Sequence, residues 1–248
     1  MKMYHINLDK DDLKGAKIAI LTGDPGRVEK IASYLEEPTK LTIAREYTSY
    51  LGKCNNKPVL VISTGMGGPS TAICVEELAQ IGITSLIRVG TSGAMQKEIN
   101  GGDIIVAQGA IRAEGTSREY LPIEFPALAD LDITCALRKS AYDLKYPCFV
   151  GVVHCKDSFY GQHSPERMPV SYDLLNKWDA WKKGGALASE METAALFIVA
   201  STLKLKAGAV LTTLWNQESD DVKLVHENYH DPDAAIKVAI KAVSKLVK

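Results

Sequence analysis

Arginines next to glycine-rich segments are the residues of this sequence whose types and spacing best suit chemistry. Arg27 ends "TGDPGR", Arg88 lies inside the apolar run "LIRVG", and Arg45 stands in "AREYTS". A buried guanidinium needs an anionic partner because an isolated buried charge is costly. Its planar fork suits phosphate or carboxylate. The sequence therefore predicts an anion-binding site at Arg88, with an internal salt bridge as the alternative.

Three glycine-rich segments, "TGDPGR", "STGMGGPS" and "RVGTSGA", each follow an apolar run that we predict to be a strand ending in a turn. In α/β folds, backbone N–H groups and helix N-termini converge at such strand ends and bind anions. Arg27 falls on the first turn of a predicted helix, where the helix dipole disfavours a cation unless a negative group lies nearby. "GMGGPS" departs from the dinucleotide-binding fingerprint at Ser70, and no acidic residue ends a strand about 20 residues later, so we do not expect a dehydrogenase.

The elements that must position these residues alternate between strand and helix, which is typical of an α/β fold with a mixed or parallel sheet. Predicted strands occupy 16–23, two parts of 42–64 around an Asn55-Asn56 turn, 84–95, 102–112, 146–158 and 207–216. Predicted helices occupy 24–35, 71–82, 189–206 and 230–248.

Local signals refine two of these segments. Ser189 and Glu192 have the spacing of a capping box at the start of the third helix, and on that helix Glu190 and Glu192 would face different directions. The long irregular segments 113–130 and 156–173 are candidate binding loops. We expect 157–168 to include a lid.

Composition restricts the class of protein. The 248 residues carry a formal net charge of −1 and are 46% hydrophobic, which argues against a dedicated nucleic-acid or membrane-surface binder. The five cysteines form no CxxC pair, so we expect neither disulfides nor a zinc cluster. No signal peptide and no apolar run of membrane-spanning length is evident. We expect a cytoplasmic protein.

The segments "TGDPGRVEKIA", "REYTSY", "STGMGGPSTAICVEELAQIG", "RVGTSGAMQ", "DSFYGQ" and "SEMETAALF", in this order, resemble the nucleoside phosphorylase-I family, and most closely its members that act on uridine. The resemblance implies one α/β domain over 1–248, with three α/β/α layers and a mixed sheet that forms a distorted barrel. It implies that phosphate displaces uracil from uridine, reversibly, in pyrimidine salvage. It also implies a homo-oligomer, a hexamer built from dimers with shared active sites. No cofactor is implied, and inorganic phosphate is the co-substrate.

The resemblance also assigns residues. Phosphate binding falls to Gly23, Arg27, Arg45 of a neighbouring subunit, Arg88 and Thr91. Ribose binding falls to His5 of the neighbour, Thr91, Met191 and Glu192. Base binding falls to Gly93, Phe159, Gln162 and Arg167. The catalytic role falls to Arg88, Glu192 and Arg27. A potassium ion is implied at Glu46, Met66 and Ser70, with hydrated side chains and no metal as the alternative.

Two features depart from the family pattern. Gln217 stands where these relatives commonly have an arginine, and in "GQHSPER" Arg167 comes later than the family's arginine. Asn216 cannot donate a proton as the aspartate of purine-cleaving relatives does, so a pyrimidine is favoured. The alternatives are a purine nucleoside phosphorylase, a nucleosidase that uses water, and a non-catalytic nucleoside-binding protein. The sequence does not rank uridine against deoxyuridine or thymidine.

Overall fold

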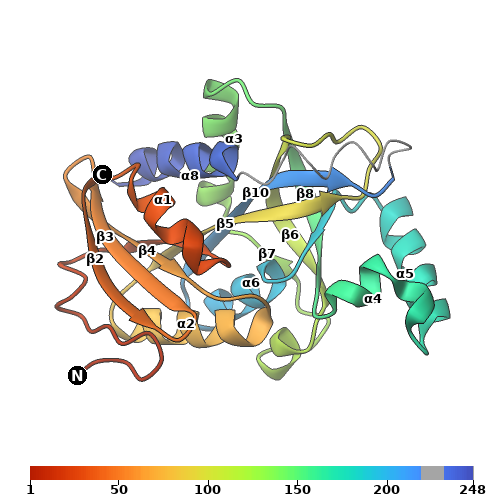
Figure 1. Ribbon diagram of the computed structural model, residues 1–248, viewed down its shortest axis with the longest axis horizontal. Helices are drawn as coiled ribbons and strands as arrows, with labels where there is room; N and C mark the ends of the chain where they lie inside the picture. The colour runs from red at the N-terminus through yellow and green to blue at the C-terminus, as the bar shows by residue number, and fades with distance from the viewer. Residues whose placement is uncertain (219–231, 248) are drawn as a thin grey trace.

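The computed structural model describes residues 1–218 and 232–247, and one mixed sheet of ten strands joins every strand in them (Figure 1). The strands are β1 (Ile18–Thr22), β2 (Glu36–Ala44), β3 (Tyr47–Cys54), β4 (Lys57–Ser63), β5 (Ser85–Ala94), β6 (Ile104–Ala113), β7 (Ala127–Leu128), β8 (Cys148–Lys156), β9 (Ala188–Glu190) and β10 (Lys206–Asn216).

Strand β5 is the centre of this sheet because it belongs to two parts of it. On one side, the ring β5–β10–β6–β8–β9–β5 closes, so these five strands form a barrel. On the other side, β1, β4, β3 and β2 extend the sheet outward. Register shifts in β10 and in β6 distort the barrel. The expected mixed sheet with a distorted barrel is confirmed.

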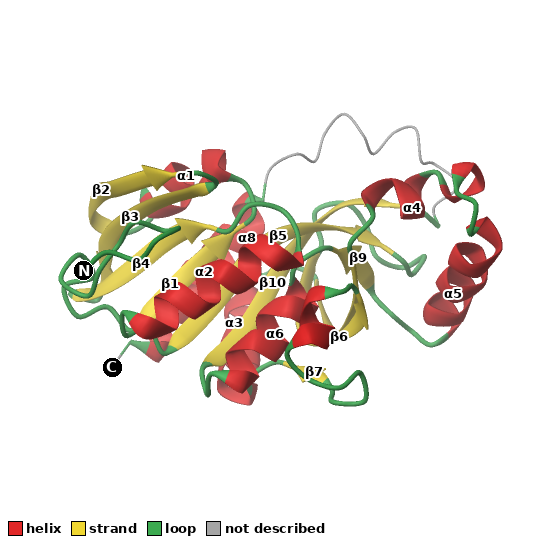
Figure 2. Cartoon of the chain, turned by 90° about the horizontal axis from the view of Figure 1, so that it is seen from below, coloured by secondary structure: helices red, strands yellow, loops and turns green. Residues whose placement is uncertain are grey.

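Helices cover both faces of the sheet, as Figures 1 and 2 show. One face carries α2 (Gly68–Gln80) and α6 (Thr193–Thr202), and the other carries α1 (Val28–Ala32), α3 (Leu131–Asp143) and α8 (Asp233–Leu246). Each face has its own cluster of buried apolar side chains. The three-layer expectation is therefore confirmed. Among the described residues, no helix is long and apolar enough to cross a membrane.

The third glycine segment is not a turn, contrary to the sequence prediction. "RVGTSGA" is extended throughout and continues β5 to Ala94. A Cβ on Gly93 would lie 2.3 Å from Nε1 of Trp215, and one on Gly90 would lie 2.8 Å from Nη2 of Arg88. Glycine is needed at these two positions because the side chains of Trp215 and Arg88 pass close to the backbone of β5 there.

The start of the third predicted helix also differs. Ser189 and Glu190 belong to β9, and α6 begins at Thr193. The carboxylate of Glu190, not a Ser189–Glu192 capping box, accepts the backbone N–H groups of Glu192 and Thr193. The capping-box prediction is therefore wrong. Because the chain is not helical at 190, the side chains of Glu190 and Glu192 both reach Arg88. On a helix, residues two positions apart would have pointed in different directions.

Other local expectations have mixed outcomes. The hairpin at Asn55 and Asn56 is confirmed, and both residues have positive φ angles, of 50° and 60°. The elements that were not predicted include β2, α3, α5 (Ser171–Lys183) and the short strand β7, and β9 replaces the start of a predicted helix. The segment 113–130 contains the 3₁₀ helix η2 (Thr116–Glu119), while 156–173 contains α4 (Phe159–His163) and η3 (Pro165–Arg167). Residues 230–231 of the last predicted helix lie outside the described residues.

Candidate active site

A cavity of about 670 Å³ brings together most of the residues predicted for the site. It lies at the ends of β1 and β5, beside β9. Its predicted lining residues are Gly23, Arg27, Arg88, Thr91, Gly93, Phe159, Gln162, Met191 and Glu192. Segments distant in the sequence thus meet because β1 and β9 both pair with β5 and end beside it.

Arg27 enters this cavity from a short turn that its neighbours shape. Oδ1 of Asp24 accepts the N–H of Gly26 at 2.8 Å and caps the 3₁₀ helix η1 (Pro25–Arg27). Nε of Arg27 lies 3.6 Å from Oδ2 of Asp24. A negative neighbour of Arg27 is therefore the carboxylate of Asp24, while the guanidinium still lines the cavity.

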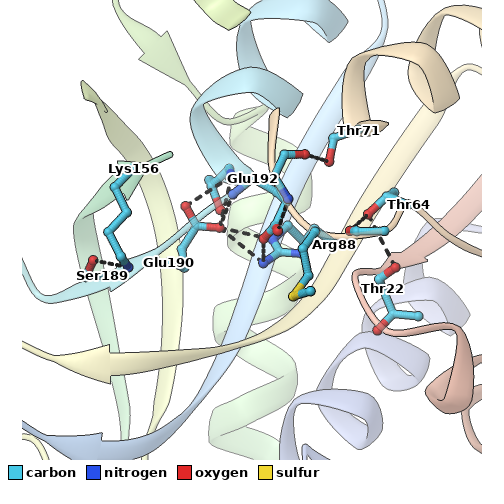
Figure 3. A network of polar contacts seen from close by, with 12 residues as sticks. Thr22, Thr64, Thr71, Arg88, Lys156, Ser189, Glu190 and Glu192 are labelled. Carbon is cyan, nitrogen blue, oxygen red and sulfur yellow. Dashed lines mark hydrogen bonds and ion pairs between the residues drawn. The ribbon is translucent and has the colours of Figure 1, made fainter. Parts of the chain in front are cut away.

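Arg88 is buried on β5 and pairs with two carboxylates, as Figure 3 shows. Its Nε lies 3.2 Å from Oε2 of Glu190, and its Nη2 contacts Oε2 of Glu192. Burial alone would lower the pKa of Arg88, but the Glu192 and Glu190 carboxylates outweigh it and hold this pKa above its ordinary value. The internal salt bridge and the cavity position are therefore both present, and neither reading of Arg88 excludes the other.

Glu192 connects Arg88 to the second glycine-rich segment. Its Oε1 accepts the backbone N–H of Gly67 at 2.6 Å, and its Oε2 faces the guanidinium. Gly67 has a φ of 93°, which places that N–H at the start of α2. The "GMGG" turn thus contributes to the site by holding a carboxylate.

Lys156 brings a second buried cation to the cavity, and the sequence reasoning missed it. It ends β8, is 7% exposed, and donates from Nζ to Oγ of Ser189 at 2.9 Å. Burial lowers its pKa, and the charge of Glu190 partly offsets this. A lysine closing the apolar run "CFVGVVHCK" was the signal that could have revealed it. In Figure 3, Lys156 and Arg88 lie on opposite sides of Glu190.

Polar and aromatic side chains complete the end of the cavity near Lys156. Oε1 of Gln162 accepts a hydrogen bond from Ser189 at 2.6 Å, and its Nε2 donates to Gln217 at 2.6 Å. The rings of Phe159, His163 and Trp215 follow one another, with centroids 4.1 Å and 4.5 Å apart. Such an arrangement suits a flat heterocycle that carries hydrogen-bonding groups on its edge.

Comparison with known proteins identifies the family. Residues 17–248 match the sequence profile of the Phosphorylase superfamily. The chain belongs to this superfamily. It is 50% identical over 244 residues to a uridine phosphorylase of Treponema pallidum, covering 98% of this chain and 94% of that protein. It is 38% identical over 248 residues to the uridine phosphorylase of Escherichia coli K12, covering 99% and 98%. A guanosine phosphorylase of Halorubrum lacusprofundi is 34% identical over 253 residues, covering 99% of each.

Some residues assigned from the family pattern lie outside this phosphorylase cavity. Nδ1 of His5 lies 2.6 Å from Oε1 of Glu77, and Arg45 lies over the ring of Tyr4, 5.5 Å from its centroid. Tyr4 and His5 are in edge contact, so His5 and Arg45 share one surface. Arg167 lies over the ring of another tyrosine and does not line the cavity.

Two residues at the end of β10 differ in role. The Asn216 amide donates to the carbonyl oxygens of Gln96 and Ile99, at 2.8 Å and 2.7 Å, so it holds a loop and does not line the cavity. Gln217 instead contacts Gln162 and His163. The part of the chain that the structure describes contains no cluster of three or more His, Cys, Asp or Glu suited to a metal ion.

Proposed function

We propose that this protein cleaves uridine with inorganic phosphate, reversibly, and forms uracil and ribose 1-phosphate. One observation carries the proposal: a single cavity holds two buried cations on opposite sides of Glu190, Arg88 on one side and Lys156 on the other. Phosphorolysis needs this arrangement because phosphate must bind at one end of the nucleoside and negative charge develops at the other. The relatives named uridine phosphorylase support the choice of base.

The arginine end supplies the attacking group. A phosphate oxygen forms a bond to C1′ as the bond from C1′ to N1 of uracil breaks, and the electron pair of that bond goes to uracil. Positive charge develops on the sugar ring in such reactions. Arg27 and Arg88 hold the phosphate against that ring, with Thr91 and the backbone at Gly23 completing the pocket. Phosphate is already anionic, so positioning and electrostatic stabilisation are what the protein contributes.

The centre of the cavity holds the ribose. Glu192 is anchored by the N–H of Gly67 and by Arg88, and its carboxylate can accept hydrogen bonds from ribose hydroxyl groups. Met191 adds an apolar surface beside it. An anchored carboxylate loses little freedom when the sugar binds, which favours a defined orientation of C1′ toward the phosphate.

The lysine end receives the leaving base. The Lys156 ammonium and the Gln162 amide line the cavity there, beside the Phe159 ring. A cation in a buried site stabilises the uracil anion more than it would in water. Lys156 supplies the positive charge that Gln217, standing where these relatives commonly have an arginine, does not carry.

The decisive experiment measures uracil release from uridine with and without phosphate, with inosine and guanosine in parallel. We expect cleavage of uridine that depends on phosphate. Cleavage without phosphate would indicate a nucleosidase, and faster cleavage of the purine nucleosides would indicate the activity named for the Halorubrum relative. Binding of uridine without turnover would indicate a nucleoside-binding protein. Deoxyuridine and thymidine belong in the same assay because the site does not rank them.

His5 and Arg45 complete the site from a neighbouring subunit in this proposal. They lie together on a surface outside their own cavity, whereas Glu46, the residue after Arg45, lines it. Mixing inactive Arg45→Ala and Arg88→Ala proteins tests this sharing. In a mixed dimer one site carries both substitutions and the other carries neither, so activity returns on mixing. Full activity of a monomer would contradict the shared site. A hexamer built from dimers, a cytoplasmic location and a role in pyrimidine salvage stay predictions.

A potassium ion at Glu46, Met66 and Ser70 also stays a proposal. Oγ of Ser70 lies 3.2 Å from the carbonyl oxygen of Met66, and both Ser70 and Glu46 lie against Gly65. Carboxylate, carbonyl and hydroxyl oxygens are suitable donors for a hard cation. The midpoint of thermal unfolding in potassium chloride against choline chloride tests it, since only a bound ion raises this midpoint selectively.

A further inference from the structure

The Ser189 hydroxyl is the meeting point of three polar side chains beside the cavity. Its Oγ lies 2.9 Å from Nζ of Lys156, 2.9 Å from Nδ1 of His154 and 2.6 Å from Oε1 of Gln162. Ser189 is 3% exposed, so protein groups surround it. Its backbone is fixed because β9 pairs with both β5 and β8, with Ser189 opposite Gly93 and His154.

The one hydrogen of Ser189 limits the directions of these bonds. A serine hydroxyl has one hydrogen to donate, and a lysine ammonium can only donate. Ser189 therefore accepts from Lys156, and because Oε1 of Gln162 faces it in the structure, it donates its one hydrogen to that oxygen. Nδ1 of His154 must then donate as well. Burial, and after it the charge of Lys156, lowers the pKa of His154 to about 3, so this imidazole is neutral at pH 7 with its hydrogen on Nδ1.

The hydrogen bonds beyond Gln162 keep the same donor-to-acceptor order. With its oxygen held by Ser189, the amide directs Nε2 to Oε1 of Gln217 at 2.6 Å. Nε2 of Gln217 then donates to Nδ1 of His163 at 2.9 Å. In this arrangement each of the two amides satisfies both of its neighbours. A flipped Gln162 would require Ser189 to turn its hydrogen to Nδ1 of His154, His154 to carry its own hydrogen on Nε2, and the Gln217 amide to flip as well.

We propose that Ser189 is a positioning residue that determines base specificity by fixing the orientation of the Gln162 amide. The proposal rests on the uridine-cleaving function above. The fixed amide offers the cavity one acceptor beside one donor. A 4-oxo pyrimidine such as uracil presents an N–H beside a carbonyl and matches this order. A 4-amino pyrimidine such as cytosine presents a bare ring nitrogen beside an NH₂, so it places acceptor against acceptor and donor against donor.

Loss of the hydroxyl should relax this discrimination. In Ser189→Ala nothing holds the Gln162 oxygen, and rotation of the amide by half a turn produces the order that cytosine needs. A neutral hydrogen bond changes binding by roughly 0.5–1.5 kcal/mol. We therefore expect the KM for uridine to rise by about 3- to 10-fold and the ratio of cytosine to uracil dissociation constants to fall by about tenfold. The KM for phosphate should stay unchanged, because Arg27 and Arg88 are untouched.

The experiment compares the wild-type enzyme, Ser189→Ala and the control Ser140→Ala. Ser140 in α3 is also fully buried, and its hydroxyl has no hydrogen-bond partner among the described residues, so its removal deletes the same atom without changing the site. Steady-state kinetics give kcat and KM for uridine, cytidine and phosphate. Calorimetry with uracil and with cytosine, each with phosphate present, gives the base selectivity without turnover. Ser140→Ala should match the wild type in every ratio.

The possible failures are distinguishable. If the wild-type protein does not cleave uridine with phosphate, the proposed function fails and this inference fails with it. If it does, but Ser189→Ala keeps the wild-type selectivity between uracil and cytosine, the inference alone is overturned. An equal loss of kcat/KM for uridine and cytidine would also overturn it, because it would mean a general structural defect. If Ser189→Ala does not fold, Ser189→Cys carries the same test, since a thiol has similar size but is a weak donor and acceptor.

Discussion

Nε and Nη2 of Arg88 both lie 3.2 Å from the same oxygen, Oε2 of Glu190. The Glu190 carboxylate also accepts the backbone N–H of Thr193 and so caps α6. One side chain therefore fixes the start of a helix and the orientation of the guanidinium that we assign to phosphate. The arginine is held in place before any substrate binds, and such preorganisation is what makes electrostatic stabilisation effective in catalysis.

Replacing Arg88 should damage both phosphate binding and folding. Arg88→Ala should lower kcat/KM by roughly 2–4 kcal/mol of transition-state free energy and raise the KM for phosphate. It should also lower the free energy of unfolding by roughly 3–5 kcal/mol, because Glu190 and Glu192 lose their buried counter-charge. Arg88→Lys keeps the charge but not the two-pronged contact, so it should fold better and still raise the phosphate KM.

The control for Arg88 is Arg138→Ala, an exposed arginine on α3. Steady-state kinetics with varied phosphate and chemical denaturation measure the two effects separately. A phosphate KM that stays at the wild-type value in Arg88→Lys would assign Arg88 a structural role only.

Replacing Lys156 should affect the chemical step more than phosphate binding. Lys156→Met removes the buried cation beside the leaving base, and we expect kcat to fall by about 10²- to 10³-fold while the KM for phosphate is unchanged. Lys177→Met is the matched control, since Lys177 is exposed and pairs with Asp173 one turn earlier on α5. Equal kcat values for the two variants would contradict the assignment.

Gly93 and Gly208 offer a test of what a single methyl group does inside and outside the site. In Gly93→Ala the new Cβ would lie 2.3 Å from Nε1 of Trp215, and in Gly208→Ala it would lie 2.4 Å from Cγ2 of Ile133. Both variants should lose roughly 1–3 kcal/mol of unfolding free energy through overpacking. Only Gly93→Ala should also raise the KM for uridine, because Gly93 and Trp215 line the cavity. A raised KM in both would mean that general instability causes the effect.

His154 should make the protein less stable in acid. Its pKa falls from 6.5 to about 3 in the folded state because it is buried, and secondarily because Lys156 is close. Between these two pH values, His154 binds a proton in the unfolded chain but not in the folded chain. The contribution of His154 to the free energy of unfolding is therefore complete above pH 6.5 and is lost as the pH falls toward 3. The His154 contribution to this loss between pH 7 and pH 4.5 is roughly 2–3 kcal/mol.

Denaturant titrations at pH 7 and pH 4.5 measure this effect. The variant His154→Asn lacks the titrating ring and should lose less stability on acidification than the wild type, because all other groups titrate in both proteins. The same pH dependence in both would show that His154 does not remain neutral in the folded protein.

The sequence by itself determined the class of fold, the hairpin at Asn55 and Asn56, and the arginines of the candidate site. These features depend on local chemistry: apolar periodicity, turn residues that tolerate positive φ, and an arginine inside an apolar run. The resemblance to a known family added the residues of the ribose and base ends, including Met191 and Gln162. It assigned His5 and Arg45 to the site of a neighbouring subunit, and both lie outside the cavity of their own chain. Arg167, which it assigned to the base, also lies outside this cavity.

Only the tertiary structure decided which groups act together. Glu190 and Glu192 converge on Arg88 because the chain at 188–190 pairs as a strand between β5 and β8, and no local signal distinguishes this from the start of a helix. Lys156 reaches the cavity because closing the barrel brings the end of β8 beside β9. Contacts between segments distant in the sequence depend on strand pairing and burial, and these are fixed only when the whole sheet forms.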